Sequence, residues 1–317
     1  MEETLVVDFT IITPVYNGAE WIEETIDSVL KVCDGYSFEY IVVNDGSTDA
    51  TLDKISKFDP KVKLVNQVNQ GEAAAVNNGL STATGTYVLI VSADDPMRSP
   101  QLLDEAKKIL DLNKSVVCAY PDWSVINSSS IVVRDVTVAE FSESRLIGEF
   151  NCIVGPGGIF RREEALNIGG RNIAYRFTSD YEFWLRLSQL GTFERIPGFL
   201  AFWREHEAST SISQRGLAMA NERIEVMTRF IGSSPQIPRK IQKMALGNAY
   251  FNAALLIYFD KKVPAKKFLF RALTIYPQGI KRFNLKILLF IVMFPLSPKV
   301  HSILMKLRFY RGKRLNA

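Results

Sequence analysis

The sequence has few cysteines, few histidines and no apolar run long enough to cross a bilayer. Its three cysteines, Cys33, Cys118 and Cys152, are odd in number and lack metal-site spacing, so we expect reduced thiols in a cytosolic compartment. The apolar stretch Ile287–Pro295 is well short of the roughly 18 to 20 residues that a membrane-spanning helix needs. The acidic start, Met1–Asp8, has no apolar run typical of a signal peptide. We therefore expect a cytoplasmic protein.

The net charge of +4 conceals a division of the chain into an acidic and a basic part. From Gln236 onward there are 17 Lys or Arg and one acidic residue, Asp260, whereas the upstream part carries more acidic than basic residues. An acidic front suits a metal cation, and a basic, apolar tail suits an anionic membrane surface. The alternative for this tail is a set of helices that pack on the rest of the protein. Nucleic acid is not an expected partner, because no recognition motif accompanies the charge.

Short apolar runs alternate with amphipathic stretches over the first 120 residues. The spacing of Ile22, Ile26 and Val29 is that of the buried side of a helix. Strands are predicted at Val6–Ile12, Tyr40–Val43, Lys63–Asn66 and Tyr87–Val91. This alternation predicts an α/β fold with a mostly parallel sheet and right-handed crossovers.

The pattern changes after Pro121. A hairpin is predicted around Asn127–Ser130, a glycine-rich turn at Gly155–Gly158 and a helix from about Ser179 to Leu190. The predicted division is a domain of residues 1–215, with halves at 1–121 and 122–215, followed by a basic helical region at 216–317.

Two of the predicted strands end in carboxylates. Asp45 follows Tyr40–Val43, and Asp94 with Asp95 follows Tyr87–Val91. Ligands of open α/β sheets bind outside the carboxyl ends of the strands, so we expect these acids to line one crevice. Adjacent carboxylates supply the hard oxygen ligands that Mg²⁺ or Mn²⁺ prefers. The crevice is suited to a base, a ribose and a metal-bound diphosphate.

Seven motifs, in order, resemble the nonprocessive branch of the family 2 glycosyltransferases, which have the GT-A fold. They are TPVYNG, VVNDGSTD, NQGEAAAVNNGL, VSADDP, GPGGIFRRE, TSDYEFWLRL and WREHEAS. The resemblance covers Phe9 to about Ser211. It implies a Rossmann-like, mostly parallel sheet flanked by helices, here with a C-terminal helical extension. It also implies an inverting enzyme that moves a sugar from a nucleotide diphosphate donor to a hydroxyl group.

The resemblance also implies roles for particular residues in donor binding. Asp45 matches an acid that accepts a hydrogen bond from the ring N–H of a uracil-like base, and a carboxylate is suited to this as an acceptor only. The alternative for Asp45 is a loop acid that caps a helix. Asp95 matches a metal ligand, and Asp94 matches a residue near the ribose or the metal. The alternative for both acids is a solvated turn before Pro96. The loop beside the base is matched by Thr13, Pro14 and Tyr16, for which a plain turn after the strand is the alternative.

Asp180 matches the catalytic base of the family, at the start of an amphipathic helix. An inverting transferase needs one such base, whereas a double displacement needs paired carboxylates. The alternative is an acid favoured there by the helix dipole. His206 matches a segment near the diphosphate, as a cation or metal ligand, or else is a surface histidine. Gly157 and Gly158 match the acceptor side, where the absence of a Cβ would let a sugar approach the backbone.

The sequence departs from the family pattern at Asn44, Ser92 and Val76, which leaves the nucleotide open, with UDP favoured. Our interpretation is a metal-dependent inverting glycosyltransferase that extends a glycan, lipid-linked and destined for the cell surface, while bound peripherally to the inner face of the membrane. One alternative is a GT-A module that binds a partner without catalysis. Another is a sugar nucleotidyltransferase, which is disfavoured because TPVYNGAEW lacks a glycine-rich phosphate loop with basic residues.

Overall fold

The computed structural model describes residues 7–206, 216–257 and 265–278. The chain divides into two compact units. The first comprises Met1–Ile147 and Asn151–Ser213, and the second comprises Gly148–Phe150 and Gln214–Ala317.

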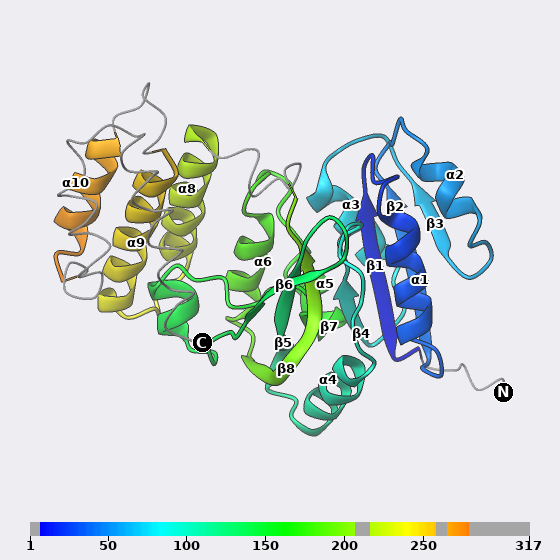
Figure 1. The fold of residues 1–317 in the computed structure, drawn as a ribbon. Coiled ribbons are helices and arrows are strands. Elements are labelled where there is room, and N and C mark those ends of the chain that lie inside the picture. The colour runs from blue at the N-terminus through cyan, green and yellow to red at the C-terminus, as the bar shows by residue number, and fades with distance from the viewer. Residues whose placement is uncertain (1–6, 207–215, 258–264, 279–317) are drawn as a thin grey trace, which may run out of the picture. The chain divides into compact units, whose positions relative to one another are not determined.

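The first unit is built on an eight-stranded sheet flanked by helices (Figure 1). Its strands are β1 (Phe9–Val15), β2 (Phe38–Asn44), β3 (Lys63–Asn66), β4 (Tyr87–Ile90), β5 (Val116–Ile126), β6 (Val132–Val136), β7 (Ile159–Arg161) and β8 (Thr192–Arg204). Its helices are α1 (Ile22–Val32), α2 (Thr51–Ser56), α3 (Glu72–Thr82), α4 (Gln101–Leu112), α5 (Arg162–Asn167) and α6 (Ser179–Leu187). A π-helical turn, η1, covers Ser144–Gly148.

The strand order is β3-β2-β1-β4-β7-β5-β6, and β8 also pairs with β5. The strands β3, β2, β1 and β4 pair in parallel, as the alternation of strands and helices predicts. The short strand β7 runs antiparallel between β4 and β5, and β5 forms the predicted hairpin with β6. The parallel part therefore brings the ends of β1, β2 and β4 to one edge, where the predicted acids follow.

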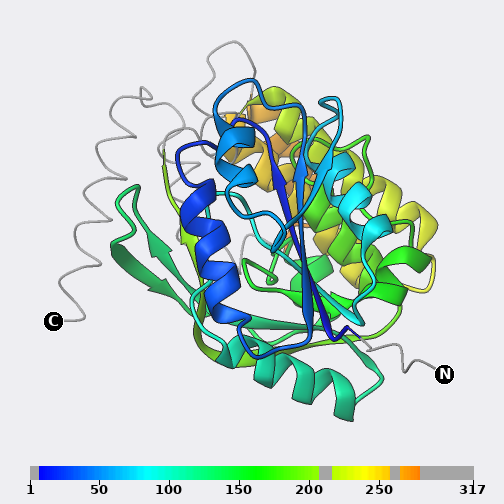
Figure 2. The ribbon, with the colours of Figure 1, turned by 90° about the vertical axis from the view of Figure 1, so that its right-hand side faces the viewer.

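Both faces of the central parallel strands β1, β2 and β4 are covered, which explains the apolar runs in β2 and β4. Successive side chains of a strand point to opposite faces. Ile11 belongs to a core cluster with Val29 of α1 and Leu103 of α4, whereas Ile12 faces Gly79 of α3. Figure 2 shows α1 running alongside β1. The sheet is thus sandwiched between α1 with α4 on one side and α3 on the other.

The second unit is helical where it is described. It contains α8 (Leu217–Ser233), α9 (Arg239–Ile257) and α10 (Ala265–Ile275). Small buried side chains, including Ala220 and Ala253, let these helices pack closely. Among the helices of the described residues, none is both long and apolar enough to span a membrane. The predicted membrane-surface segment around Ile287–Pro295 lies outside the described residues.

Candidate active site

Asp45 lies directly after β2 and is buried in a ring of donors. Its Oδ1 accepts hydrogen bonds from Gln67 Nε2 and from the backbone N–H of Gln70, both at 2.8 Å. Its Oδ2 accepts one from the backbone N–H of Gly71 at 2.8 Å. Three of the roughly four acceptor positions of the carboxylate are therefore occupied, and one remains for an N–H of a ligand. Asp45 also fixes the start of α3.

Asn44 shows why an amide fits the position before Asp45. Its Nδ2 donates to Asn66 Oδ1 at 2.9 Å, and its Oδ1 accepts from the backbone N–H of Ser47 at 3.0 Å. A carboxylate could not donate the first of these bonds. The Asn44 amide thus ties the end of β2 to the end of β3 and holds the start of the loop between β2 and α2.

The three residues predicted beside the base differ in how they meet solvent. The Thr13 side chain is fully buried, and its hydroxyl lies 3.0 Å from that of Tyr40. Pro14 is also buried in β1. Tyr16 is 52% exposed. Tyr16 is thus the one of the three whose side chain a donor can reach.

The structure brings Asp94, Asp95 and His206 together, although the histidine lies more than a hundred residues away in sequence. His206 Nε2 is 2.8 Å from Asp94 Oδ2. Asp95 Oδ1 accepts a 2.6 Å hydrogen bond from the backbone N–H of Arg204, at the end of β8. The end of β8 therefore lies directly on the acidic loop after β4.

The two neighbouring acids differ in environment. Asp95 is buried and Asp94 is partly exposed. Burial, and then the nearby Asp94 carboxylate, raises the pKa of Asp95 well above its usual range. A cation bound between these acids would favour the charged form that burial disfavours.

Arg204 and Trp21 complete this corner of the site, and the sequence motifs do not assign either a role there. Arg204 is completely buried, with its Nε donating to the Asp94 carbonyl at 2.6 Å and its Nη2 to Glu24 Oε2 at 2.8 Å. The Trp21 ring lies 4.3 Å from the His206 ring between centroids. The sequence feature that could have identified Arg204 is its position in WREHEAS, two residues before His206.

The side chains at this corner fit a divalent metal ion that takes its remaining coordinating oxygens from a bound diphosphate. The described residues hold no cluster of three or more His, Cys, Asp or Glu side chains at metal-binding distances. Mg²⁺ is commonly held by one or two carboxylates together with substrate phosphates. Asp95 and Asp94 supply the carboxylate oxygens. The Nδ1 atom of His206 is buried without a hydrogen-bond partner among the described residues, so this ring has a nitrogen to spare.

Asp180 lies in the first turn of α6, and its side chain is exposed to solvent. The protein around it nevertheless raises the pKa of its carboxyl, mainly by desolvation. Arg171 opposes this shift and Glu72 adds to it. An exposed carboxylate with a raised pKa is a stronger base than an ordinary aspartate.

A buried aromatic cluster anchors α6 behind Asp180. The rings of Phe183 and Trp184 lie 5.2 and 5.6 Å from that of Phe160 in β7, measured between centroids. Tyr181 donates a hydrogen bond from its hydroxyl to the Leu146 carbonyl. These contacts fix the start of the helix, and with it the backbone of Asp180.

The glycines predicted on the acceptor side are required by packing. A Cβ on Gly157 would lie 2.8 Å from that of Ala201, and one on Gly158 would lie 2.5 Å from a methyl of Val154. The φ angle of Gly157 is +84°, which other residues rarely adopt. Protein packing thus accounts for both glycines before any acceptor is considered.

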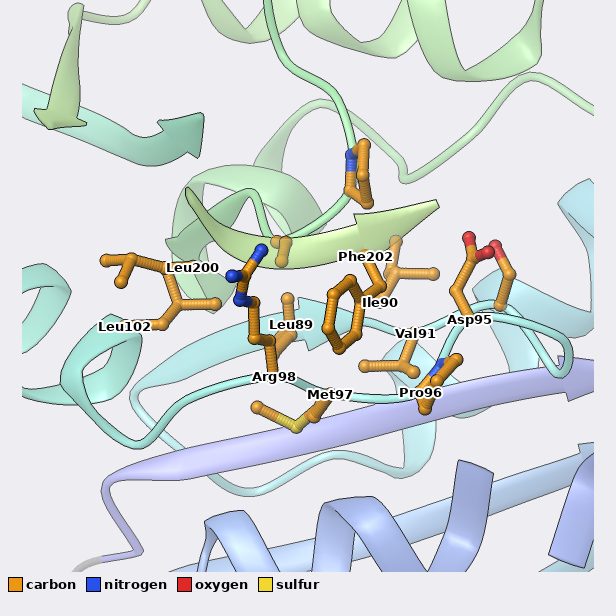
Figure 3. A pocket seen from close by; sticks show the side chains of 14 residues that line it. Leu89, Ile90, Val91, Asp95, Pro96, Met97, Arg98, Leu102, Leu200 and Phe202 are labelled. Atoms are coloured by element: carbon orange, nitrogen blue, oxygen red, sulfur yellow. The ribbon is translucent and has the colours of Figure 1, made fainter. Parts of the chain in front are cut away.

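Gly157 also lines a small recess that Asp95 borders (Figure 3). Phe202 and Arg98 lie side by side in it, with the Arg98 guanidinium 4.8 Å from the centre of the ring. Its cavity volume is about 40 Å³, which suits a few water molecules and is too small for a sugar ring. An acceptor would therefore lie outside this recess.

Comparison with known proteins identifies the class. Residues 10–168 match the model of glycosyl transferase family 2, about half of the chain. The chain belongs to this family, as its motifs predict. An uncharacterized glycosyltransferase of Haemophilus influenzae is 26% identical over 221 residues, covering 64% of this chain and 67% of that protein.

The hyaluronan synthase of Pasteurella multocida is 29% identical over 223 residues, covering 68% of this chain and only 22% of that protein. The chain thus spans about a fifth of this much longer relative.

Solved structures confirm the predicted fold class. S. aureus TarS 1-349 in complex with UDP-GlcNAc superposes with a TM-score of 0.60 at 18% identity, covering 86% of this chain and 92% of that one. The mannosyltransferase PcManGT from Pyrobaculum calidifontis, in complex with GDP-Man and Mn²⁺, gives 0.55 at 20% identity, covering 86% and 81%. At these identities the likeness concerns the fold, a GT-A sheet flanked by helices.

Proposed function

We propose that this protein is a metal-dependent inverting glycosyltransferase that moves a sugar from a nucleotide diphosphate donor to a hydroxyl of an acceptor. The observation that carries the proposal is the place of Asp180: an accessible carboxylate in the first turn of α6, on the unit that also holds the acidic loop of Asp94 and Asp95. An inverting transfer needs one base of this kind.

In the proposed reaction the acceptor hydroxyl oxygen attacks the anomeric carbon of the donor. Asp180 takes the hydroxyl proton as the new C–O bond forms. The bond between the anomeric carbon and the diphosphate oxygen breaks, and the nucleoside diphosphate leaves with the bonding electron pair. Because this is a single displacement, the anomeric configuration inverts and no second carboxylate is required.

Asp95 and Asp94, with His206 beside them, are the proposed ligands of Mg²⁺ or Mn²⁺. When bound, the metal would neutralise charge on the diphosphate as it leaves. Arg204 holds Asp95 through its backbone N–H and Asp94 through the Asp94 carbonyl, so the loop is set before any ligand arrives.

The donor proposed is a UDP-sugar. The remaining acceptor position on Asp45 supports this, because uracil has a ring N–H that a carboxylate can bind. That the TarS structure was obtained with UDP-GlcNAc agrees with a UDP-linked donor, while PcManGT with GDP-Man shows that the fold also takes another nucleotide. The exposed side chain of Tyr16 supports the proposal that this residue contacts the base.

The acceptor proposed is a growing glycan, lipid-linked and at the inner face of the cell membrane. The basic residues from Gln236 onward support an anionic surface as partner. We expect the intact chain to sediment with vesicles that contain anionic lipid and to stay in solution with purely zwitterionic vesicles. Equal behaviour with both would contradict the membrane role and leave the transfer proposal standing.

Thermal unfolding with UDP- and GDP-sugars, with and without Mn²⁺, tests donor binding, and release of nucleoside diphosphate tests catalysis. We expect a UDP-sugar to raise the melting temperature only with metal, and Asp95→Ala to abolish that rise. Asp180→Asn should keep the rise and lose at least 100-fold in rate, in line with the usual contribution of a general base. A non-catalytic binding module would show the rise without turnover in the wild type. A nucleotidyltransferase would release pyrophosphate from a nucleoside triphosphate instead.

A further inference from the structure

A bridge of hydrogen bonds ties α3 to the segment that precedes α6. The side-chain amide of Asn77 pairs with the backbone of Arg171 at two points, since its Nδ2 donates to the Arg171 carbonyl and its Oδ1 accepts from the Arg171 N–H, both at 2.7 Å. The preceding Gly170 has a φ of +68°, and a Cβ there would lie 2.4 Å from Asn77 Oδ1. The backbone at Arg171 is thus held against α3.

The side chain of Arg171 turns to the same helix. Its Nη1 donates to Glu72 Oε1 at 2.6 Å, and the residue is 8% exposed. Its Nε is buried and has no hydrogen-bond partner in the described part of the chain. Glu72 itself is largely exposed, so the pair consists of a buried cation and an accessible anion.

The other end of the segment is held by α6. Arg186 Nη2 donates to the Gly170 carbonyl at 2.7 Å, and its Nη1 donates to the Ile168 carbonyl. The same guanidinium is paired with Glu182 at 2.7 Å. The turn that carries Arg171 is therefore fixed from α3 and from α6, the helix that begins with Asp180.

We propose that Arg171 is a positioning residue for the Asp180 carboxylate, held in place by Glu72 and Asn77 and acting through its fixed positive charge. The inference rests on the proposed function, in which Asp180 is the base. It adds to that function a residue that the motifs of the sequence do not assign.

Two charges near Asp180 shift its pKa in opposite directions. Arg171, from the segment before α6, lowers the pKa of Asp180, and Glu72, from the start of α3, raises it. On α6 itself, the charge of Glu182 is balanced by the guanidinium of Arg186, with which it forms an ion pair. Removing the charge of Arg171 should therefore raise the pKa of Asp180, and removing that of Glu72 should lower it.

The test is a pH titration of the intact protein labelled with ¹³C at the aspartate carboxyl carbons, followed by NMR. Loss of one resonance in Asp180→Asn assigns Asp180. Arg171→Met should raise the titration midpoint by about 0.5 to 1 pH unit, and Glu72→Gln, which keeps an acceptor for Arg171, should lower it. Arg171→Lys keeps the charge and should stay near the wild type. Lys107→Met, which removes a partly exposed cation on α4, is the matched control and should leave the midpoint unchanged.

The pH dependence of kcat/KM for release of UDP from a UDP-sugar should shift in the same two directions. Donor affinity in Arg171→Met should stay close to that of the wild type, because Asp45 still holds the start of α3. Midpoints that move oppositely in the two variants support the inference. Coincident midpoints, or a loss confined to donor affinity, would reduce Arg171 to a structural role, while the proposed function would stand as long as Asp180→Asn abolishes transfer. If Asp180→Asn retains transfer, the proposed function fails, and the positioning role fails with it.

Discussion

Replacing Arg204 by Met should destabilise the first unit strongly, because this guanidinium is the buried partner of several separate segments. It is completely buried, donates to the carbonyls of Asp94 and Asn127 at 2.6 and 3.1 Å, and pairs with Glu24. A buried acceptor left without a donor costs about 1 to 3 kcal/mol. Glu24 is 42% exposed and can turn to water, so its lost pair adds less than about 1 kcal/mol.

The Asp94 carbonyl loses its donor, whereas the Asn127 carbonyl still accepts from the backbone N–H of Ser130 at 3.0 Å. One orphaned carbonyl and the lost pair together give about 1 to 4 kcal/mol for Arg204→Met. At about 2 to 4 °C per kcal/mol for a unit of this size, the melting temperature should fall by roughly 2 to 16 °C. Differential scanning calorimetry of the intact protein measures this change. Arg204→Lys keeps the charge but loses most of the N–H donors of the guanidinium, so its melting temperature should lie between those of Arg204→Met and the wild type.

Glu24→Gln is the matched control, since it removes the exposed partner alone and should cost less than about 1 kcal/mol. The metal-dependent stabilisation by a UDP-sugar should also weaken in Arg204→Met, because the loop of Asp94 and Asp95 loses its support. A melting temperature for Arg204→Met no lower than that of the wild type, where a fall of at least about 2 °C is expected, would refute this account of the buried contacts.

Three further outcomes are expected. Asp122→Asn should cost about 3 kcal/mol at pH 7, because the buried Asp122 pairs with Arg195 at 2.6 Å. Burial alone would raise the pKa of Asp122, but hydrogen bonds from Arg195 and two backbone N–H groups lower it below its usual value. The difference in unfolding free energy between the wild type and Asp122→Asn, measured by urea titration, should therefore shrink as the pH falls below about 4. Gly79→Ala should destabilise by about 1 kcal/mol despite the better helix propensity, since the new Cβ would lie 2.6 Å from Ile12 Cγ2. Gly232→Ala, where nothing lies within 4 Å, should not destabilise. Chelation of metal should abolish the effect of a UDP-sugar on the melting temperature in the wild type and change nothing in Asp95→Ala.

The parallel part of the fold follows from local sequence because each strand is a short apolar run and each helix has apolar residues at helical spacing. All seven residues of β1 are buried, including Thr10 and Thr13 between its apolar residues, as expected for a strand covered on both faces. The end of α6 was less accurately predicted, as the helix stops at Leu187 and the segment to Leu190 forms turns. Helix ends depend on capping contacts that periodicity does not describe.

The candidate site was predictable to the extent that its residues follow strand ends. The contact between His206 and Asp94 needed β8 to pair with β5 and return to the acidic loop, which no local pattern states. Arg171 lies in none of the seven motifs, and Glu72, 99 residues away in NQGEAAAVNNGL, has no role assigned by its motif. For Gly157 and Gly158 the sequence identifies positions without a Cβ, but it does not say whether protein or ligand fills the space. In the structure, protein side chains fill it.

The segment Gln70–Glu72, where α3 begins, connects the two ends of the proposed reaction. Asp45, the proposed reader of the base, binds the N–H groups of Gln70 and Gly71, and the next residue, Glu72, binds Arg171. Donor recognition and the charge of Arg171 that acts on Asp180 therefore both depend on the start of α3. A variant that shifts α3 as a body, such as Gly79→Ala, should alter donor affinity and the pH dependence of turnover together. Glu72→Gln, which changes charge and leaves the helix in place, should alter the pH dependence alone. If both variants changed the two quantities in the same proportion, α3 would act as a support for the donor and not as a link between the donor and the base.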